Sequence, residues 1–371
     1  MTDADEAPYV VTTPWRRDAG ELQPLLEAWA RSAVSDSATV FDVQAPEGTG
    51  MSSETVLFDM RRGEGGGVER FAARLAPLPS VYPVFPEYDI EMQRRCMNLV
   101  RERTAVPTPE VPWCELDPAW LGVPFLVMHR VDGAAPPDMP PYVFGGWVMD
   151  ASPDERARMQ ENAVRVLAGV HEVTAENAGL SFLARPEYGD TALAQQIGYQ
   201  RWYYEWARND VRYPLIDRTF AWLEDRPPEE GPTVLNWGDA RIGNILWEGM
   251  EPVAVLDWEM ASAGPVEVDL AWMIFLHTFF QDIAERYEMP GIPGFMDRRE
   301  VVEAYERISG RTVRDLEWYE VFAALRFAIV SVRTSTRGIA YGAAEKTDDP
   351  DDLIMFRSLL EKMLDGTFWS G

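Results

Sequence analysis

The chain has 371 residues, 46% of them hydrophobic and 12% aromatic, which is enough to bury a sizeable core and excludes a disordered protein. Its 34 Lys and Arg residues are outnumbered by 61 Asp and Glu residues, and the net charge of −27 disfavours nucleic acids and anionic membranes as partners. With two cysteines and three widely separated histidines, neither a disulfide framework nor a histidine metal centre is expected.

The N-terminal segment, residues 1–18, is acidic and contains prolines, and we expect it to be flexible. It has no apolar run typical of a signal peptide, and no stretch of the sequence approaches the roughly 20 apolar residues of a membrane helix. We therefore expect a cytoplasmic protein that contacts no membrane and no nucleic acid.

Residues 19–131 are predicted to form a small, β-rich lobe. Apolar spacing and turn residues predict, in chain order, a helix at 19–34, strands at 40–44, 55–60 and 68–75, a helix at 87–103 and a strand at 124–131. A loop of small residues, 48–53, separates the first two strands. Such a loop lets backbone N–H groups approach phosphates.

Residues 132–371 are predicted to form a larger, mainly helical lobe. The helical segments lie at 152–173, 191–223 (one helix or two), 267–286, 299–308, 313–333 and 351–364. Only 233–257 breaks this pattern, with short apolar runs that predict a hairpin. The two parts together predict a two-lobed α+β fold, and the cleft between the lobes is a natural ligand site.

The most informative stretch reads NWGDARIGNILW and continues, after a turn, as VAVLDWE. Asp239 and Asn244 lie on its glycine-containing loop, and Asp257 lies at the far end of the hairpin. Because a hairpin returns its second strand beside the first, we expect Asn244 and Asp257 to face one another. Two oxygen ligands placed in this way suit Mg²⁺. Asp239 can then accept a proton from a hydroxyl that attacks a γ-phosphate.

These motifs resemble those of the aminoglycoside phosphotransferase and choline kinase family, which has a protein-kinase-like fold. The family's loop reads His-Gly-Asp-x-x-x-x-Asn and precedes a metal-binding Asp; here GDARIGN and LDWE stand in those places. The segment 261–271 also resembles the family, and its Asp269 matches an Asp that braces the catalytic loop. Trp237 replaces the family's loop histidine, and its indole N–H can donate a similar hydrogen bond.

The resemblance implies an ATP- or GTP-dependent and Mg²⁺-dependent phosphotransferase, and it assigns roles to individual residues. In the helical lobe it implies Asp239 as the base, Arg241 as a phosphate contact, and Asn244 and Asp257 as the metal ligands. In the β-rich lobe it implies a nucleotide clamp made of Gly50, Ser52, Ser53, Arg74 (in place of the family's lysine) paired with Glu91, and the backbone of His129 and Val131.

The resemblance leaves the acceptor open. It implies a hydroxyl of a small molecule, such as an aminoglycoside, an amino-alcohol or a natural product. An aromatic stripe at helical spacing, Tyr199, Trp202, Tyr203 and Trp206, is predicted as core and alternatively as a wall of the acceptor pocket. Glu259 is predicted to be an exposed carboxylate and alternatively to approach the metal or the substrate.

Two other functions stay open at this stage. A nucleotide-binding regulatory pseudokinase is suggested by Trp237 and by the missing lysine, although Asp239, Asn244 and Asp257 are retained. A protein kinase is disfavoured, because no activation-segment pattern follows Asp257. The sequence gives no oligomeric state.

Overall fold

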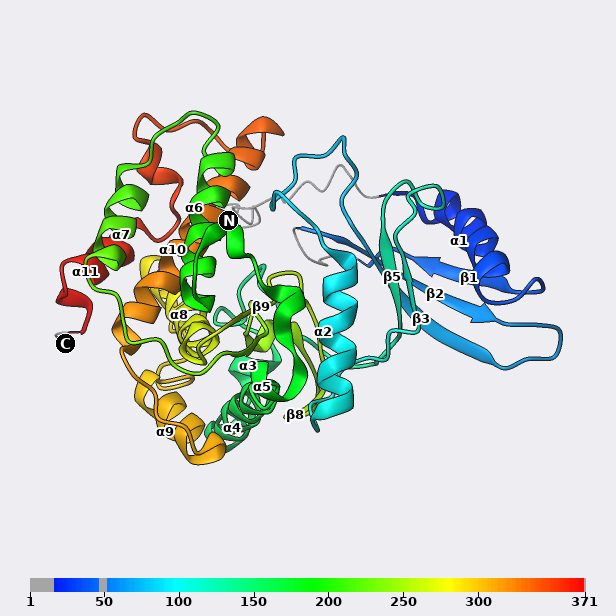
Figure 1. Ribbon diagram of the computed structural model, residues 1–371, viewed down its shortest axis with the longest axis horizontal. Helices are drawn as coiled ribbons and strands as arrows, with labels where there is room; N and C mark the ends of the chain where they lie inside the picture. The colour runs from blue at the N-terminus through cyan, green and yellow to red at the C-terminus, as the bar shows by residue number, and fades with distance from the viewer. Residues whose placement is uncertain (1–16, 47–51, 370–371) are drawn as a thin grey trace, which may run out of the picture.

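The protein consists of a sheet-containing part and a larger helical part, which lie side by side along the long axis (Figure 1). The structure is a computed structural model and describes residues 17–46 and 52–369. It confirms the predicted α+β fold, with a small antiparallel sheet followed by a mostly helical remainder. The exact lobe boundary near residue 131 stays a prediction.

The sheet of the smaller part has five antiparallel strands in the order β1-β2-β3-β5-β4. These strands are β1 (Thr39–Gln44), β2 (Glu54–Arg61), β3 (Val68–Leu75), β4 (Trp113–Glu115) and β5 (Phe125–His129). β2 and β3 pair along eight residues, and alternate side chains of β2 are buried, as expected for a sheet with one covered face. The four predicted strands are confirmed to within a few residues, whereas β4 was not predicted.

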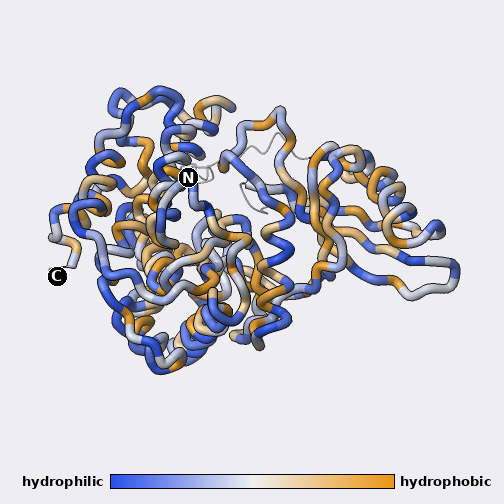
Figure 2. The backbone as a smooth tube through the Cα atoms, viewed as in Figure 1, coloured by the Kyte–Doolittle hydropathy of each residue, from blue (hydrophilic) through white to orange (hydrophobic). Residues whose placement is uncertain are grey.

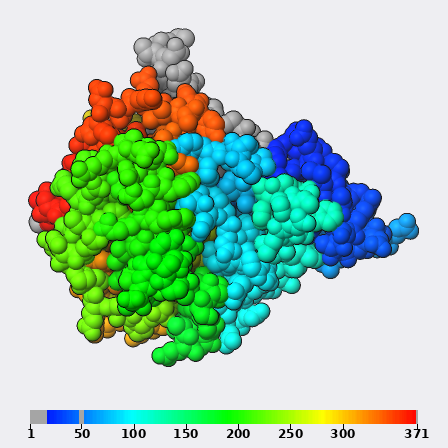
Figure 3. Space-filling view, turned by 45° about the horizontal axis from the view of Figure 1, so that its top comes forward, coloured from blue at the N-terminus to red at the C-terminus, as the bar shows by residue number. Residues whose placement is uncertain are grey.

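Two helices accompany this sheet, α1 (Ala19–Ala33) and α2 (Ile90–Arg103). α1 covers β1, and its Trp29 meets the ring of Phe125 edge to face at 5.3 Å. α2 begins three residues later than predicted, because Asp89 caps it by accepting from the N–H of Met92. The space-filling view shows the segment that contains α2, in cyan, between the blue N-terminal residues and the green helices (Figure 3).

The helical part also contains two short two-stranded ladders. Its helices are α3 (Trp147–Asp150), α4 (Pro153–Val170), α5 (Ala175–Ala178), α6 (Ala192–Ala207), α7 (Pro214–Glu224), α8 (Glu267–Arg286), α9 (Arg298–Ser309), α10 (Leu316–Ala340) and α11 (Arg357–Leu364). Its strands are β6 (Val234–Asn236), β7 (Ile245–Glu248), β8 (Glu251–Val255) and β9 (Ser262–Gly264). β7 pairs with β8 as the predicted hairpin, and β6 pairs with β9.

One open prediction is resolved, and two predicted helices differ from the observed ones. The segment 191–223 is two helices, because Asn209 and Asp210 adopt positive φ angles of 46° and 63° and Pro214 starts α7. α10 continues to Ala340, seven residues beyond the predicted end at residue 333. The last predicted helix, 351–364, is divided into a 3₁₀ turn (Pro350–Leu353) and α11.

α8 and α10 form the centre of the helical part. Nearly all side chains of α8 up to Phe280 are buried, and Phe275 and Phe279 meet Phe327 of α10 and Phe356 edge to face. Figure 2 shows apolar stretches along the sheet and the inner helices and hydrophilic stretches on outer loops. None of the helices in the described residues has the length and apolar character that a membrane crossing requires.

Candidate active site

A tight turn after β6 forms the loop that carries Asp239. Gly238 has a φ of +93°, and a Cβ there would clash with the carbonyl oxygen of Met260, so the turn requires glycine. The N–H groups of Trp237 and Gly238 donate to the two carboxylate oxygens of Asp269 at 2.6 and 2.9 Å. Asp269 lies in the first turn of α8, so this helix braces the loop through Asp269, as the sequence predicted.

The replacement of the loop histidine by Trp237 keeps one hydrogen bond of the loop. The indole N–H of Trp237 donates to the carbonyl oxygen of Leu256 at 2.8 Å. Leu256 directly precedes Asp257, so the buried indole joins the Asp239 loop to the end of the hairpin. The predicted donor function of Trp237 is therefore confirmed.

Three side chains hold the carboxylate of Asp239. Asn244 donates to Oδ2 at 2.6 Å, the indole of Trp272 donates to Oδ1 at 2.8 Å, and Nε of Arg241 lies 3.1 Å from Oδ2. Burial acts to raise the pKa of Asp239, but the charge of Arg241 and these hydrogen bonds outweigh burial and lower it. Asp239 is therefore ionised at neutral pH and can accept a hydrogen bond from a hydroxyl.

The hairpin of β7 and β8 brings the backbone of Asn244 beside Leu256, the residue before Asp257, and the predicted facing of the Asn244 and Asp257 side chains stays a prediction. Asn244 directly precedes β7, and the N–H of Leu256 donates to its carbonyl oxygen at 2.9 Å. The side-chain nitrogen of Asn244 is engaged by Asp239, which leaves its amide oxygen for a cation. No group of three or more His, Cys, Asp or Glu residues able to hold a metal occurs among the described residues. A carboxylate and an amide, completed by phosphate oxygens and water, nevertheless fit Mg²⁺.

Arg74 of β3 does not pair with Glu91, and this predicted ion pair is wrong. Its Nη2 atom lies 2.7 Å from Asp257 and 3.1 Å from Glu259. Glu91 lies in the first turn of α2, where its half-exposed carboxylate pairs with Arg94 one turn later. The counter-ions of Arg74 thus come from the segment that follows β8.

Glu259 is a buried carboxylate, contrary to the prediction that it is exposed. Its side chain is 8% exposed, and it accepts hydrogen bonds from Ser52, from Ser53 at 2.9 Å and from Arg74. Burial, and then the like charge of Asp257, raise the pKa of Glu259 to about 7. Glu259 therefore connects the small-residue loop and β3 to the helical part.

The predicted phosphate loop is described only in part. Ser52 and Ser53 belong to the described residues, and both hydroxyls donate to Glu259. Gly50 lies outside the described residues. A phosphate contact by the backbone of this loop therefore stays a prediction.

The predicted adenine site lies at the end of β5, where backbone groups make hydrogen bonds within the protein. The N–H of His129 donates to the carbonyl of Glu110 at 2.9 Å, and the N–H of Arg130 donates to Arg70. The N–H of His129 is thus used within the protein, and an adenine contact through the carbonyl of His129 stays a prediction. Val131 is half-buried and stays a predicted contact.

The profile of the Phosphotransferase enzyme family matches residues 50–320, which include the whole constellation from Ser52 to Glu259. The chain belongs to this family. The match shows a phosphotransferase relationship without identifying an acceptor.

Curated relatives of this phosphotransferase family member carry other names. A probable acyl-CoA dehydrogenase, IBR3 of Arabidopsis thaliana, is 24% identical over 326 residues, which cover 80% of this chain and 36% of the relative. Acyl-CoA dehydrogenase family member 11 of Gallus gallus is 29% identical over 199 residues, which are 53% of this chain and 23% of the relative. The chain thus spans about a third or less of the length of these relatives.

Solved structures share the fold of this phosphotransferase family member. A candidate aminoglycoside phosphotransferase from Ralstonia eutropha JMP134 superposes with a TM-score of 0.63 at 20% identity, covering 92% of this chain and 96% of its own. The aminoglycoside phosphotransferase APH(4)-Ia, in a complex with ADP and hygromycin B, superposes with a TM-score of 0.53 at 15% identity, covering 93% and 98%. At these identities the likeness concerns the fold alone.

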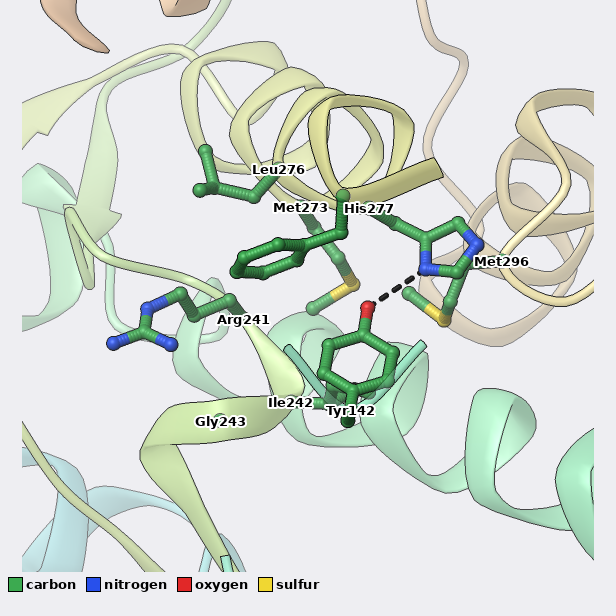
Figure 4. Close-up of a pocket in the computed structure, with 9 residues that line it drawn as sticks. Tyr142, Arg241, Ile242, Gly243, Met273, Leu276, His277 and Met296 are labelled. Atoms are coloured by element: carbon green, nitrogen blue, oxygen red, sulfur yellow. Dashed lines mark hydrogen bonds between the residues drawn. The ribbon is translucent and has the colours of Figure 1, made fainter. Parts of the chain in front are cut away.

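A small pocket borders the Asp239 loop of this phosphotransferase family member on the side of α8 (Figure 4). Arg241, Ile242 and Gly243 form one wall, and apolar side chains of α8 form the other. Across it the hydroxyl of Tyr142 lies 2.7 Å from Nδ1 of His277. Burial lowers the pKa of His277 to about 3, so the imidazole is neutral at physiological pH.

Of the aromatic stripe of α6, Tyr203 is core, whereas Tyr199, Trp202 and Trp206 are only partly buried, and the alternative of an acceptor wall stays a prediction for them. Tyr203 is buried, and its hydroxyl donates to the carbonyl of Val84 at 2.8 Å. The ring of Trp206 lies 3.9 Å from the guanidinium carbon of Arg333. These contacts hold the segment around Val84 against α6 and pack α6 against α10.

Sequence reasoning missed Trp272, and it favoured an exposed Glu259 over one that approaches the site. Trp272 lies three residues after Asp269, and helical spacing puts both side chains on one face of α8. Glu259 lies two residues after Asp257, in a turn where Asp257 has a φ of 60°, so no strand spacing selects it. Trp272 is thus recognisable from its spacing to Asp269, whereas Glu259 is not recognisable from a local pattern.

Proposed function

We propose that this member of the phosphotransferase family transfers the γ-phosphate of ATP, or of GTP, to a hydroxyl of a small molecule in a Mg²⁺-dependent reaction. The observation that carries the proposal is the ionised Asp239, held in one orientation by Asn244 and Trp272. Arg74 and Asp257 meet on the same side of the loop, which supports a site for a charged nucleotide.

The chain's own residues account for each part of the transfer. Asp239 accepts the proton of the acceptor hydroxyl, whose oxygen bonds to the γ-phosphorus while the bond from phosphorus to the leaving diphosphate oxygen breaks. Arg74 and Arg241 stabilise the negative charge of the phosphoryl oxygens. Asn244 and Asp257 would hold Mg²⁺, which when bound neutralises part of the phosphate charge. The backbone of the loop containing Gly50, Ser52 and Ser53 and that of Val131 would complete the nucleotide clamp.

The acceptor is proposed only as a class. The fold neighbour APH(4)-Ia binds hygromycin B, a hydroxylated small molecule, which supports a small acceptor over a protein. The acidic composition is compatible with a cationic acceptor, but the acidic residues occur throughout the sequence. Aminoglycosides, amino-alcohols and other hydroxylated natural products therefore belong in one test panel.

The test is an acceptor screen with the full chain, Mg²⁺ and ATP or GTP, followed by ADP or GDP release and by the mass of the phosphorylated product. Asp239→Ala should lower kcat by roughly 100- to 10,000-fold, the usual contribution of a general base. It should leave the Kd of a non-hydrolysable ATP analogue within about twofold. Asp257→Ala should instead weaken the Mg²⁺-dependent binding of that analogue.

The same screen distinguishes the proposed phosphotransferase from a regulatory pseudokinase. Tight Mg²⁺-dependent binding of the analogue, with no product from any acceptor, would favour a pseudokinase and contradict the proposed transfer. Loss of analogue binding in a folded Asp239→Ala variant would contradict the role assigned to Asp239.

A further inference from the structure

The first turns of α8 contact three successive residues of the catalytic loop. Asp269 binds the backbone N–H groups of Trp237 and Gly238. One turn later on the same face, the indole N–H of Trp272 donates to Oδ1 of Asp239 at 2.8 Å. α8 therefore holds both the backbone of the loop and the orientation of its reactive side chain.

α10 fixes Trp272 from the opposite side. The guanidinium carbon of Arg326 lies 4.4 Å from the centre of the Trp272 ring, and its Nη2 atom donates to the carbonyl oxygen of Gly238 at 2.8 Å. Phe327 meets the Trp272 ring edge to face at 6.1 Å. Trp272 is 2% exposed and Arg326 is 3% exposed. The indole is thus packed against Arg326 and Phe327, and in this position its N–H points toward Asp239.

The hydrogen bonds to the two carboxylate oxygens of Asp239 show how the Trp272 indole restrains this side chain. Oδ2 accepts from Asn244 and Arg241, whereas Oδ1 accepts from Trp272 and, at 3.2 Å, from Arg241. Without the indole, only the Arg241 guanidinium holds Oδ1, and the same nitrogen also serves Oδ2. The carboxylate plane is then free to rotate toward Arg241.

We propose that Trp272 is a positioning residue for phosphoryl transfer, which acts by fixing the carboxylate of Asp239 in the plane required to accept the acceptor proton. This inference rests on the proposed function, because it takes Asp239 as the base. A small loss of alignment at a reacting group lowers the rate without changing the binding of distant parts of the substrate. Trp272 donates to Asp239, and its ring contacts are with Arg326 and Phe327.

The test compares Trp272→Phe with Trp318→Phe. Trp272→Phe keeps a ring against Arg326 and removes the N–H. Trp318 is also a buried tryptophan, and its indole donates to the carbonyl of Leu223 at 3.0 Å, away from the loop. Trp272→Phe should lower kcat roughly 10- to 100-fold, the effect of one hydrogen bond to a charged group, with the KM for ATP within about twofold. Trp318→Phe should leave kcat unchanged.

A double-mutant cycle separates positioning from a general structural effect. In an Asp239→Ala background, Trp272→Phe should reduce the residual rate by less than about twofold, because the residue through which it acts is gone. If Trp272→Phe lowers the residual rate of Asp239→Ala as much as it lowers the wild-type kcat, the inference is overturned. A Trp272→Phe enzyme with wild-type kcat would also overturn it, while a dead Asp239→Ala enzyme would still support the proposed function.

A measurement without turnover tests the same contact. The indole N–H resonance of Trp272, identified by its loss in Trp272→Phe, should shift in Asp239→Asn, while that of Trp318 should not. An unchanged Trp272 resonance would contradict the inference even if no acceptor is found.

Discussion

Arg74 takes its partners from the residues after β8, with Asp257 at 2.7 Å and Glu259 at 3.1 Å from the same nitrogen. Burial acts to lower the pKa of this guanidinium, but the two carboxylates outweigh burial and raise it. Two close carboxylates without Arg74 would repel one another in a site that excludes most water. At the scale of single residues, the cation of β3 therefore stabilises the predicted metal ligand as well as nucleotide phosphates.

The first prediction concerns the choice between Glu259 and Glu91 as the partner of Arg74. Arg74→Gln should raise the Kd of the Mg²⁺–ATP analogue roughly 10- to 100-fold, since hydrogen bonds to charged groups contribute about 1.5–3 kcal/mol. Glu91→Gln should change neither this Kd nor the unfolding free energy by more than about 0.5 kcal/mol, because its pair with Arg94 is partly exposed. Calorimetric titration measures the Kd of each variant, and urea unfolding measures its free energy of unfolding. Equal weakening by the two variants would indicate that Glu91 reaches Arg74 in the bound state.

The second prediction uses the buried His277, whose pKa is lowered to about 3 by burial. An unfolded histidine has a pKa of about 6.5, so between these values the unfolded chain binds a proton that the folded chain excludes. Stability should therefore fall with falling pH, by about 2 kcal/mol between pH 7 and pH 5 from this residue. Urea unfolding of His277→Gln should lack that part of the decline. Parallel pH profiles for the two proteins would show that His277 is protonated in the folded state.

At the scale of elements, the long helices and the hairpin were predictable because their periodicity is local. The strands β4, β6 and β9 were missed, since each has three residues and the pairing of Val234–Asn236 with Ser262–Gly264 depends on tertiary structure. The break between α6 and α7 comes from two positive φ angles that Asn209 and Asp210 tolerate but do not require.

The candidate site also contains residues that were predictable from the sequence and residues that were not. Asp239, Asn244 and Asp257 were predictable because loop and hairpin lie within one continuous stretch. The ion-pair partners of Arg74 were not predictable. Arg74 and Glu259 are 185 residues apart, and no local pattern selects Glu259 over Glu91. Trp272 was missed because an aromatic residue in an apolar helix is normally core.

The third prediction tests α8 as the brace of the loop. Asp269→Asn keeps the shape of the side chain but replaces one acceptor oxygen by a donor, opposite the N–H groups of Trp237 and Gly238. It should lower the unfolding free energy by about 2–4 kcal/mol and abolish turnover. Ser152→Ala removes the capping box of α4 and should cost about 1 kcal/mol with turnover unchanged. Urea unfolding and the acceptor assay would distinguish them, and an active Asp269→Asn enzyme would show that the brace is dispensable.

At the scale of the whole molecule, the two parts are joined by charged contacts at the proposed nucleotide site. Ser52, Ser53 and Arg74 from the sheet side all bind Glu259 on the helical side. These are the groups that phosphates and Mg²⁺ would engage, so the same side chains hold the parts together and form the site. Binding at this place is therefore expected to change the stability of the whole chain.

The last prediction follows from this arrangement. A ligand that binds only the folded chain stabilises it by about 2.7 kcal/mol at 100 times its Kd. Mg²⁺ together with a non-hydrolysable ATP analogue should therefore raise Tm by several degrees, whereas Mg²⁺ alone should have little effect because the described residues offer it few ligands. Asp257→Ala should lose the Mg²⁺-dependent part of this shift, and Glu91→Gln should keep it. A shift that is the same with chelator present would place the nucleotide away from Asn244 and Asp257.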